Sequence, residues 1–394
     1  MSGADVLIIS GRDTRVGAST VVADDLLSID AGRDVSIVSG VNSQTSEQAS
    51  HSKSKGINLL PSGLTPSVTI LHSTRDNGDG ISASTTAAAS TVGSLGGDVT
   101  ITAASKYQQT GSDVLALTGD IDIQARQVDI TEARETRSST SQQSSKSTVL
   151  GATPRNALVD AIKGAQTTLD TAQATAQTGN SRVQALGAAA TALSAYNTAN
   201  QVAELVAAPE KIASITIDFN LGSNKSRSES TETVNSGRAS TVAAAGDVRI
   251  VAKGAGTDSD ILIRGSDVSA GQDATLKAEG DVRLESSQDR TTLHSTNNSS
   301  GASIGVGVSF GASNGITFNA SANKARGNAD GQDAIQRNTQ IVAGNTARIE
   351  SGADTTLAGA SVTGKTVQAE VGGSLNIESR QDTSTFTSDQ QSSG

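Results

Sequence analysis

The stretch from Gly265 to Gln288, GSDVSAGQDATLKAEGDVRLESSQ, decides the fold. Apolar and polar residues alternate in ATLKA from Ala274 and in DVRL from Asp281, and corners rich in Gly, Asp and Ser precede both segments. A Gly-polar corner followed by such an alternation is typical of a short strand that leaves a tight turn. The stretch therefore predicts short strands joined by tight corners.

The same pattern recurs along the chain. Gly, a polar residue and an apolar-X-apolar triplet follow one another in six segments, which start at Gly32, Gly97, Gly119, Gly246, Gly280 and Gly373. Further short strand-like segments start at Asp260, Ala274, Ala347 and Thr355, and GSDV occurs at Gly111 and Gly265. Short strands in coils of roughly 20 residues indicate a parallel β-helix. Coils would stack about 4.8 Å apart around a thin core of Val, Ile and Leu.

We therefore predict an all-β fold, a right-handed parallel β-helix or solenoid. The composition agrees, because aromatic residues make up only 2% of the 394 residues and the 40 Gly residues suit many corners. We assign the Asp residues of the repeated motif to turns rather than to catalysis, because Asp tolerates corner conformations and caps its own turn.

Five tracts rich in Ser, Thr, Asn and Gln interrupt the repeats. They are Gln44 to Lys55, Ser138 to Thr148, Ser223 to Thr241, Thr291 to Ser300, and Thr383 to Ser393. Such tracts cannot bury apolar surface, and in isolation they are typical of disorder. Strand-like alternation adjoins three of them, so we expect tract and alternating segment to form one module that is ordered against the solenoid or projects from it.

Two amphipathic β segments have one apolar face each, and the second is a hairpin with a GASNG turn. Two interpretations stay open. The hairpins could cover the flank of the solenoid, or strands of about 7 to 10 residues could enter an outer membrane. The candidate membrane-contact residues are Ile215, Ile217, Phe219, Leu221, Ile304, Val306, Val308, Phe310, Ile316 and Phe318.

Between Thr153 and Ile212 the periodicity changes to that of a helix. Pro154 suits the first helical position, TGN from Thr178 breaks the apolar stripe, and Pro209 ends the second stripe. We predict an inserted α-helical hairpin that is too polar to span a bilayer. The expected organisation is β-helix coils with polar tracts over 1–152, the helical hairpin over 153–212, and coils with amphipathic hairpins over 213–394.

The sequence carries no pattern of catalytic, cofactor-binding or metal-ligating residues. It has no Cys, its three His residues lack metal-ligand spacing, and DNGDG from Asp76 misses the spacing of a calcium loop. The net charge of −10 and the lack of a basic cluster interleaved with aromatic residues argue against nucleic acid as a partner. The N-terminus lacks the pattern of a signal peptide, so an export signal would lie outside this chain.

The order of polar tract, alternating hairpin and GDVxI strand resembles a known family. GSDVLALTGDIDIQARQVDITEARETRSSTSQQSSKS, GVGVSFGASNGITFNASANKARGNADGQD and VGGSLNIESRQDTSTFTSDQQSSG are similar to the haemagglutinin-repeat region of filamentous-haemagglutinin-like large exoproteins. The similarity is to those of the contact-dependent growth inhibition type, exported by two-partner secretion in Gram-negative bacteria. The resemblance covers nearly the whole chain and implies a β-helical filament segment of a far longer protein.

The resemblance implies a function without enzymatic activity. The segment would act as a filament or stalk of a secreted cell-surface exoprotein and help deliver a C-terminal toxin across the target-cell outer membrane. Implied partners are that membrane or a surface receptor, and an outer-membrane two-partner secretion transporter that acts through regions outside this chain. The alternative is an adhesin that binds host or bacterial surface glycans or receptors. A polysaccharide-cleaving β-helix enzyme is a third alternative.

Overall fold

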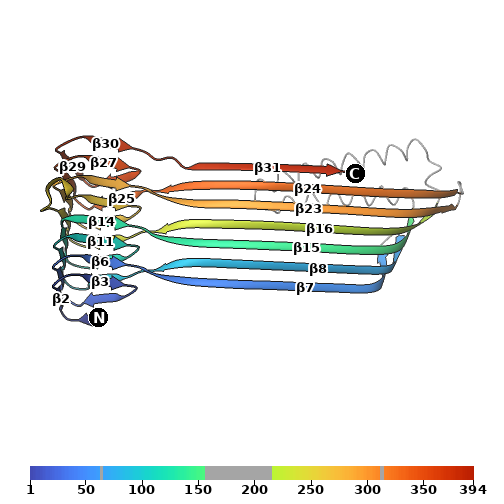
Figure 1. Ribbon diagram of the computed structural model, residues 1–394, viewed down its shortest axis with the longest axis horizontal. Coiled ribbons are helices and arrows are strands. Elements are labelled where there is room, and N and C mark those ends of the chain that lie inside the picture. The colour runs from blue at the N-terminus through green and yellow to red at the C-terminus, as the bar shows by residue number, and fades with distance from the viewer. Residues whose placement is uncertain (63–64, 156–214, 311–314) are drawn as a thin grey trace.

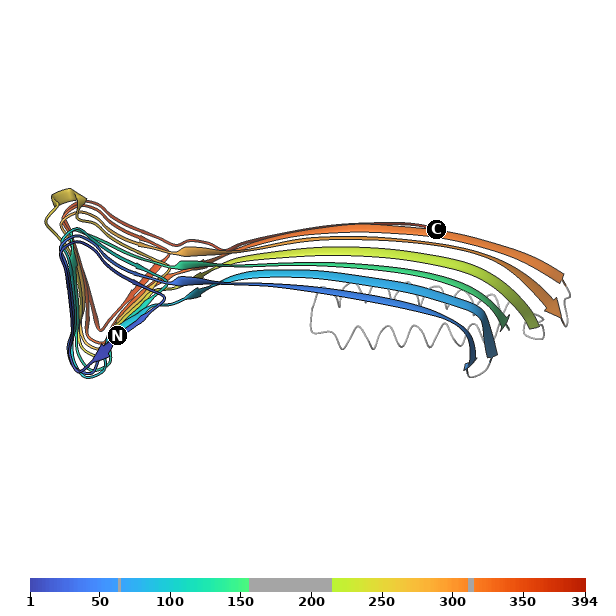
Figure 2. The same cartoon turned by 60° about the horizontal axis from the view of Figure 1, so that its bottom comes forward.

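The structure, a computed structural model, describes residues 1–62, 65–155, 215–310 and 315–394. The described residues form a solenoid with a triangular cross-section and one long sheet that projects from one corner of the triangle (Figures 1 and 2). Three parallel eight-stranded sheets make the sides of the solenoid, and an antiparallel seven-stranded sheet makes the projection. The predicted parallel β-helix is confirmed.

Each side of the solenoid takes one short strand from every coil. The first sheet contains β1 (Ser2–Gly3), β4 (Thr20–Ala23), β9 (Thr91–Ser94), β12 (Asp113–Ala116), β17 (Thr241–Ala244), β20 (Asp267–Ala270), β25 (Thr339–Ala343) and β28 (Ala360–Thr363). The second contains β2 (Val6–Ser10), β5 (Leu27–Ala31), β10 (Val99–Ala103), β13 (Ile121–Ala125), β18 (Val248–Ala252), β21 (Ala274–Ala278), β26 (Thr346–Ser351) and β29 (Thr366–Val371). The third contains β3 (Thr14–Gly17), β6 (Val35–Val38), β11 (Lys106–Thr110), β14 (Gln127–Thr131), β19 (Ile261–Arg264), β22 (Val282–Glu285), β27 (Thr355–Ala358) and β30 (Leu375–Glu378). A 3-10 turn, η2 (Gly256–Asp258), lies in the loop before β19.

Aliphatic ladders fill the core because alternate residues of each strand point inward. On the second sheet Ile29, Ile101, Ile123 and Ile250 lie in register on successive coils, and all four are fully buried. Burying one such side chain contributes about 1.5–3 kcal/mol. A core one side chain thick has little room for rings, and the one buried aromatic residue that the structure describes is Tyr107.

Tyr107 belongs to a buried polar pair inside the third sheet. Its hydroxyl donates to Gln109 Oε1 at 3.0 Å, and the Gln109 amide donates to the carbonyls of Ser112 and Thr241. Burial raises the pKa of the Tyr107 hydroxyl above its ordinary value, so this hydroxyl stays a donor. The pair therefore satisfies the polar atoms that interrupt the aliphatic ladder.

The Asp residues of the repeated motif form ladders between coils. Asp98 Oδ1 accepts the backbone N–H of Asp120 at 2.9 Å, Asp120 Oδ1 accepts that of Asp247 at 2.7 Å, and Asp247 Oδ1 accepts that of Asp273 at 2.9 Å. The assignment to corner chemistry rather than catalysis agrees with this geometry. The expected partner was wrong, however, because each carboxylate caps the corner of the next coil.

The projecting sheet is built from strands of unusual length. In spatial order it contains β7 (Gly40–Ser62), β8 (Thr65–Ala88), β15 (Ala133–Arg155), β16 (Ile215–Arg238), β23 (Ser287–Phe310), β24 (Gly315–Arg337) and β31 (Thr383–Ser393). The first six have 23 or 24 residues. All five polar tracts lie in these strands, except for the last residues of the third tract, so the tracts project from the solenoid as ordered β-structure.

Hairpins leave the solenoid at one corner of alternate coils. Pairs β7–β8, β15–β16 and β23–β24 follow β6, β14 and β22. The other coils turn the same corner tightly, at Ala18–Ser19 before the first hairpin, at Gly111–Ser112 and Gly265–Ser266 between hairpins, and at Gly359 after the third. Gly111 and Gly265 both have φ of +52°, which explains why GSDV recurs. Coils stack about 4.8 Å apart and a hairpin is two strands wide, so hairpins on every second coil form a continuous sheet.

Part of one prediction lies outside the described residues. The inserted helical hairpin was expected over 153–212, and the structure describes only Thr153–Arg155 of it. These residues continue β15, where Pro154 pairs in register with Ile217, so the expected helix start at Thr153 was wrong. The pairing of β15 with β16 extends the strand past the position where sequence periodicity placed the cap.

Candidate interaction surface at the tip of the projecting sheet

Register places the predicted contact residues side by side. Phe219 pairs with Val306, which pairs with Phe318, and Leu221 pairs with Ile304. Residues directly opposite in an antiparallel sheet point to the same face. Two further rows join Ile217 to Val308 and Ile316, and Ile215 to Phe310.

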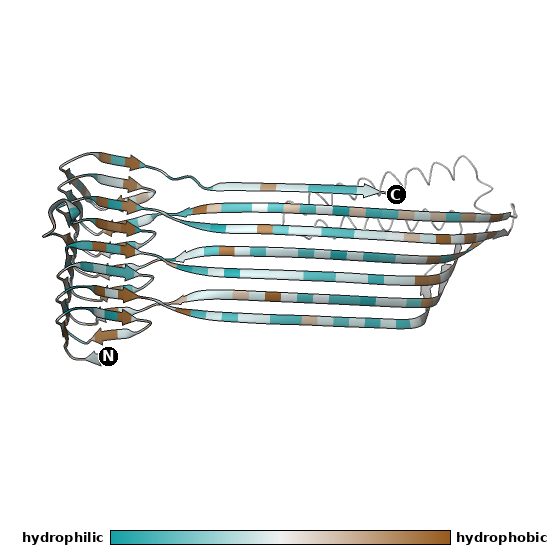
Figure 3. Cartoon of the chain, in the orientation of Figure 1, coloured by the Kyte–Doolittle hydropathy of each residue, from teal (hydrophilic) through white to brown (hydrophobic). Residues whose placement is uncertain are grey.

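We call the apolar surface formed here the tip patch. Its rows lie at the end of the sheet farthest from the solenoid, where Figure 3 shows hydrophobic bands on otherwise hydrophilic strands. The members are Leu150, Ile217, Phe219, Leu221, Ile304, Val306, Val308, Phe310, Ile316, Phe318 and Ala320.

Water reaches much of the tip patch. Phe318 is 81% exposed, Ile316 65%, Ile304 62% and Phe310 55%. Leu150 and Ala320, with Phe219 and other members, line a shallow hollow of about 440 Å³. A contiguous apolar surface of this kind marks a place where another apolar phase or partner binds. Removing it from water would contribute about 25 cal/mol per Å².

Sequence reasoning missed one contributor to the tip patch, Leu150, because its neighbour comes from a distant part of the chain. Leu150 follows a polar tract and pairs with Leu221. The strand length was also wrong, since the amphipathic segments are only the outer parts of much longer strands. The sequence did contain a signal for the strand length. Each polar tract has a similar length when it is counted together with the alternating segment beside it.

The opposite face of the tip is polar, and its Asn side chains explain Gly305 of GVGVSFG and Gly301 before it. A Cβ on Gly305 would overlap the side-chain oxygens of Asn220 and Asn319, its neighbours on the adjacent strands. Gly301 stands in the same relation to Asn224 and Asn323. These two glycines therefore make room for rows of Asn side chains.

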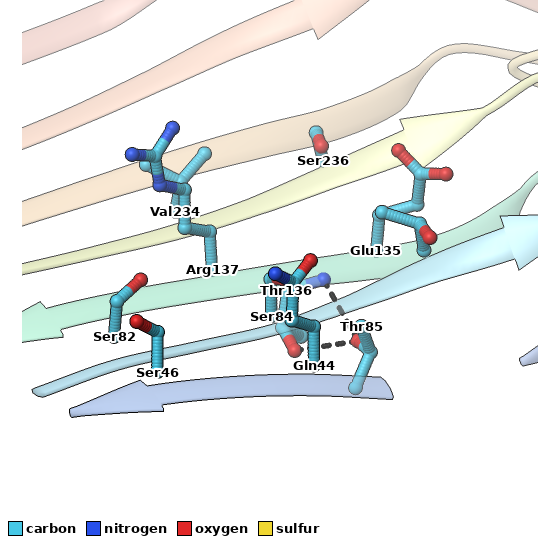
Figure 4. Close-up of a pocket in the computed structure, with 11 residues that line it drawn as sticks. Gln44, Ser46, Ser82, Ser84, Thr85, Glu135, Thr136, Arg137, Val234 and Ser236 are labelled. Carbon is cyan, nitrogen blue, oxygen red and sulfur yellow. Dashed lines mark hydrogen bonds between the residues drawn. The ribbon is translucent and has the colours of Figure 1, made fainter. Parts of the chain in front are cut away.

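A second hollow of about 500 Å³ lies near the root of the sheet (Figure 4). Arg137 and Val234, which line it, stand an odd number of residues from Leu150 and Leu221 on the same strands, so they lie on the face opposite the tip patch. Its polar walls include Gln44, Glu135 and Arg137, and the Thr85 and Thr136 hydroxyls hydrogen-bond at 2.7 Å beside it. Glu135 Oε1 already accepts the Ala87 N–H at 2.9 Å. The hollow is open and its carboxylate is engaged in the sheet, so it favours no reaction.

Titratable residues outside the tip patch are dispersed. His294 Nδ1 lies 2.6 Å from Asp330 Oδ1 and His51 Nδ1 lies 3.1 Å from Asn77 Oδ1, all in exposed positions. Among the described residues no group of three His, Cys, Asp or Glu side chains is placed to hold a metal ion. Within the same residues, no helix has the length and apolarity needed to cross a bilayer.

Stacked three-sided coils and a sheet of projecting hairpins define a repeat solenoid, and comparison with known proteins identifies its class. A family model described as Hemagglutinin repeat matches residues 221–393. The matched segment therefore carries haemagglutinin repeats, and the matching relatives support the resemblance of the chain to filamentous-haemagglutinin-like exoproteins of the contact-dependent growth inhibition type.

Relatives match over the full length of the chain. The tRNA nuclease CdiA of Escherichia coli (strain STEC_O31) is 34% identical over 397 residues, and the 16S rRNA endonuclease CdiA of Enterobacter cloacae is 34% identical over 401 residues. The alignments cover 100% of this chain and 12% of each relative. The deoxyribonuclease CdiA of Yersinia pseudotuberculosis is 30% identical over 396 residues, which are 99% of this chain and 36% of that relative.

Proposed function

We propose that this region is a non-enzymatic stalk of a secreted cell-surface exoprotein, and that the tip patch enters the outer membrane of a target cell during delivery of a toxin domain. The observation that carries the proposal is the tip patch itself, an exposed apolar surface held at the far end of 23- and 24-residue strands. The flank-covering alternative does not fit this arrangement, because the patch lies at the end of the sheet away from the solenoid (Figure 2).

The relatives support a role in delivery rather than in cleavage. Their names give three different nucleic-acid targets, tRNA, 16S rRNA and DNA, yet all match this chain over 99% or more of its length. Because this region is similar in relatives with different nucleic-acid targets, it is unsuited to determining which nucleic acid is cleaved. Carrying a variable domain is a task that all of them would share. Secretion by a two-partner transporter, acting through other regions, belongs to the same proposal.

The dimensions of the tip patch suit partial insertion. From the Leu221 row to the Phe310 row the strands advance six residues, about 20 Å. The hydrocarbon core of a bilayer is about 30 Å thick, so the patch would reach past one leaflet. Within the apolar phase the two central strands of the patch, β16 and β23, keep their backbone hydrogen bonds through a neighbour on each side.

Co-sedimentation with outer-membrane vesicles and with phosphatidylcholine liposomes tests the proposal. The variant Ile304→Gln plus Phe318→Gln removes apolar surface without changing charge, and we expect it to lose binding to both at unchanged circular dichroism. The matched control, Ile81→Gln plus Ile335→Gln, changes residues 53% and 56% exposed on the same sheet but away from the tip. Equal binding by both variants and wild type would refute membrane entry by the tip patch and favour the adhesin alternative.

A further inference from the structure

One register row of the projecting sheet carries cations on strand after strand. Lys53 pairs with Arg75, Arg75 with Lys146, and Lys146 with Lys225, so β7, β8, β15 and β16 each place a cation at the same height. Ser300 of β23 follows, and then Lys324 of β24. We call Lys53, Arg75, Lys146, Lys225 and Lys324 the cationic row; all five side chains are exposed.

The cationic row shares a face with the tip patch. Lys146 precedes Leu150 by four residues and Lys225 follows Leu221 by four residues, an even spacing that keeps both on one face. Four residues of strand correspond to about 13 Å. The positions behind the row, on the other face, include Ser52, Ser145, Ser226 and Ser299 and no cation.

Within the part of the chain that the structure describes, the row has no ion-pair partner. Among the described residues no carboxylate oxygen lies within 4.0 Å of any of its five nitrogen-bearing groups. Like charges directly opposite on adjacent strands destabilise a sheet, and here four stand in succession. An anion bound along the row would relieve this repulsion.

Charges on this face are sorted by height. Asp79 and Glu229 lie four residues from Arg75 and Lys225 on the solenoid side, and Arg227 and Arg326 lie between the two levels. Thus acidic, cationic and apolar levels follow one another toward the tip on this face. An anionic surface would be attracted most strongly at the cationic level.

Lys324 and Arg326 add a hollow to the cationic level. With Gln391, Ser392 and Ser393 they line a space of about 340 Å³, and the Arg326 Nε donates to Gln391 Oε1 at 2.9 Å. The Gln391 contact holds the guanidinium in place beside the Lys324 ammonium. Hydroxyls next to paired cations provide donors of the kind that bind phosphate.

We propose that the cationic row binds phosphate groups at the surface of the membrane that the tip patch enters. This inference rests on the proposed function and names the chemistry of its partner. The interfacial layer of a bilayer is about 5–7 Å thick on each side, and long Lys and Arg side chains extend toward it along the sheet. Cations about 13 Å above the first apolar row therefore meet the phosphate level once the patch is inserted.

The test compares vesicles of phosphatidylcholine alone with vesicles that also contain phosphatidylglycerol or lipid A. The variant Lys146→Gln plus Lys225→Gln removes two cations of the row, and the control Lys253→Gln plus Lys365→Gln removes two exposed cations of the solenoid. Since each cation near an anionic surface strengthens partitioning several-fold, we expect the row variant to bind anionic vesicles about tenfold or more weakly and the control to bind like wild type. Lys146→Arg plus Lys225→Arg should restore binding, and added salt should weaken it.

The outcomes separate the two proposals. Weaker binding of the row variant to anionic vesicles alone supports the inference. Equal losses by row variant and control, or wild-type binding that ignores anionic lipid, would overturn it and leave the tip patch standing if phosphatidylcholine vesicles still bind. If wild type binds no vesicle of any composition, the proposed function fails as well. Loss of oligonucleotide binding with vesicle binding intact would assign the row to nucleic acid instead.

Discussion

At the scale of single residues, corner glycines decide whether coils can close. Gly265 has φ of +52°, and a Cβ there would overlap Ser287 Cβ and Oγ at the root of the next hairpin. Gly256 has φ of +60°, but a Cβ there would meet no neighbouring atom. Gly11 has neither a positive φ nor a crowding neighbour. Ala18 takes φ of +48° at the equivalent first corner, so the conformation alone is tolerated where space exists.

These three glycines separate backbone strain from crowding. Gly11→Ala should leave stability unchanged, and Gly256→Ala should lower the free energy of unfolding by about 1 kcal/mol through φ alone. Gly265→Ala should lower the free energy of unfolding by about 1–3 kcal/mol more than Gly256→Ala does, because Ser287 must also move. Urea unfolding followed by circular dichroism measures all three. Equal changes in the free energy of unfolding for Gly256→Ala and Gly265→Ala would show that Ser287 moves aside without destabilising the protein.

At the scale of elements, the sequence predicts the solenoid well and the projecting sheet poorly. Every repeated Gly-polar-apolar segment is a strand, because a buried ladder enforces alternation of apolar residues. The polar tracts carry no apolar alternation, since both faces of Ser138 to Thr148 meet water or other polar side chains. Their order comes from backbone hydrogen bonds to strands that are distant in sequence, as between Thr140 and Thr231. No local pattern records that pairing.

Order imposed by neighbours predicts a gradient of protection across the sheet. The Ser138 to Thr148 tract of β15 pairs on both sides, whereas the Gln44 to Lys55 tract of β7 pairs with β8 alone among the described residues. Amide hydrogen exchange read by mass spectrometry should therefore be slower in the β15 tract by tenfold or more, the factor that about 1.4 kcal/mol of extra stability produces. Equally fast exchange in both tracts would show that both are disordered, as their composition alone suggests.

At the scale of the whole molecule, two spacings must agree. Each coil adds about 4.8 Å to the solenoid and each hairpin adds two strand widths to the sheet. Hairpins therefore fit on every second coil, and the tight corners at Gly111 and Gly265 occupy the coils between.

Deletions test this agreement. Removing residues 241–266 takes out one coil and joins Ser240 to Asp267, which is the register partner of Thr241. Two hairpins would then leave consecutive coils, and we expect fast amide exchange in β16 and β23. Removing residues 241–339 takes out two coils with their hairpin and joins Ser240 to Gln340. Despite its greater size, this deletion should leave β15 and β16 protected. Protection of β16 and β23 after the smaller deletion would contradict the spacing argument.

The alternation of hairpin and corner has a consequence for avidity. A longer array of the same two-coil unit widens the sheet without changing its height, so every added pair of strands brings its apolar end and its cation to the same level. Weak contacts of single strands with a surface then act together, since binding of one strand raises the effective concentration of its neighbours. Under the membrane binding proposed above, the number of two-coil units in the solenoid would set how firmly the sheet holds the membrane.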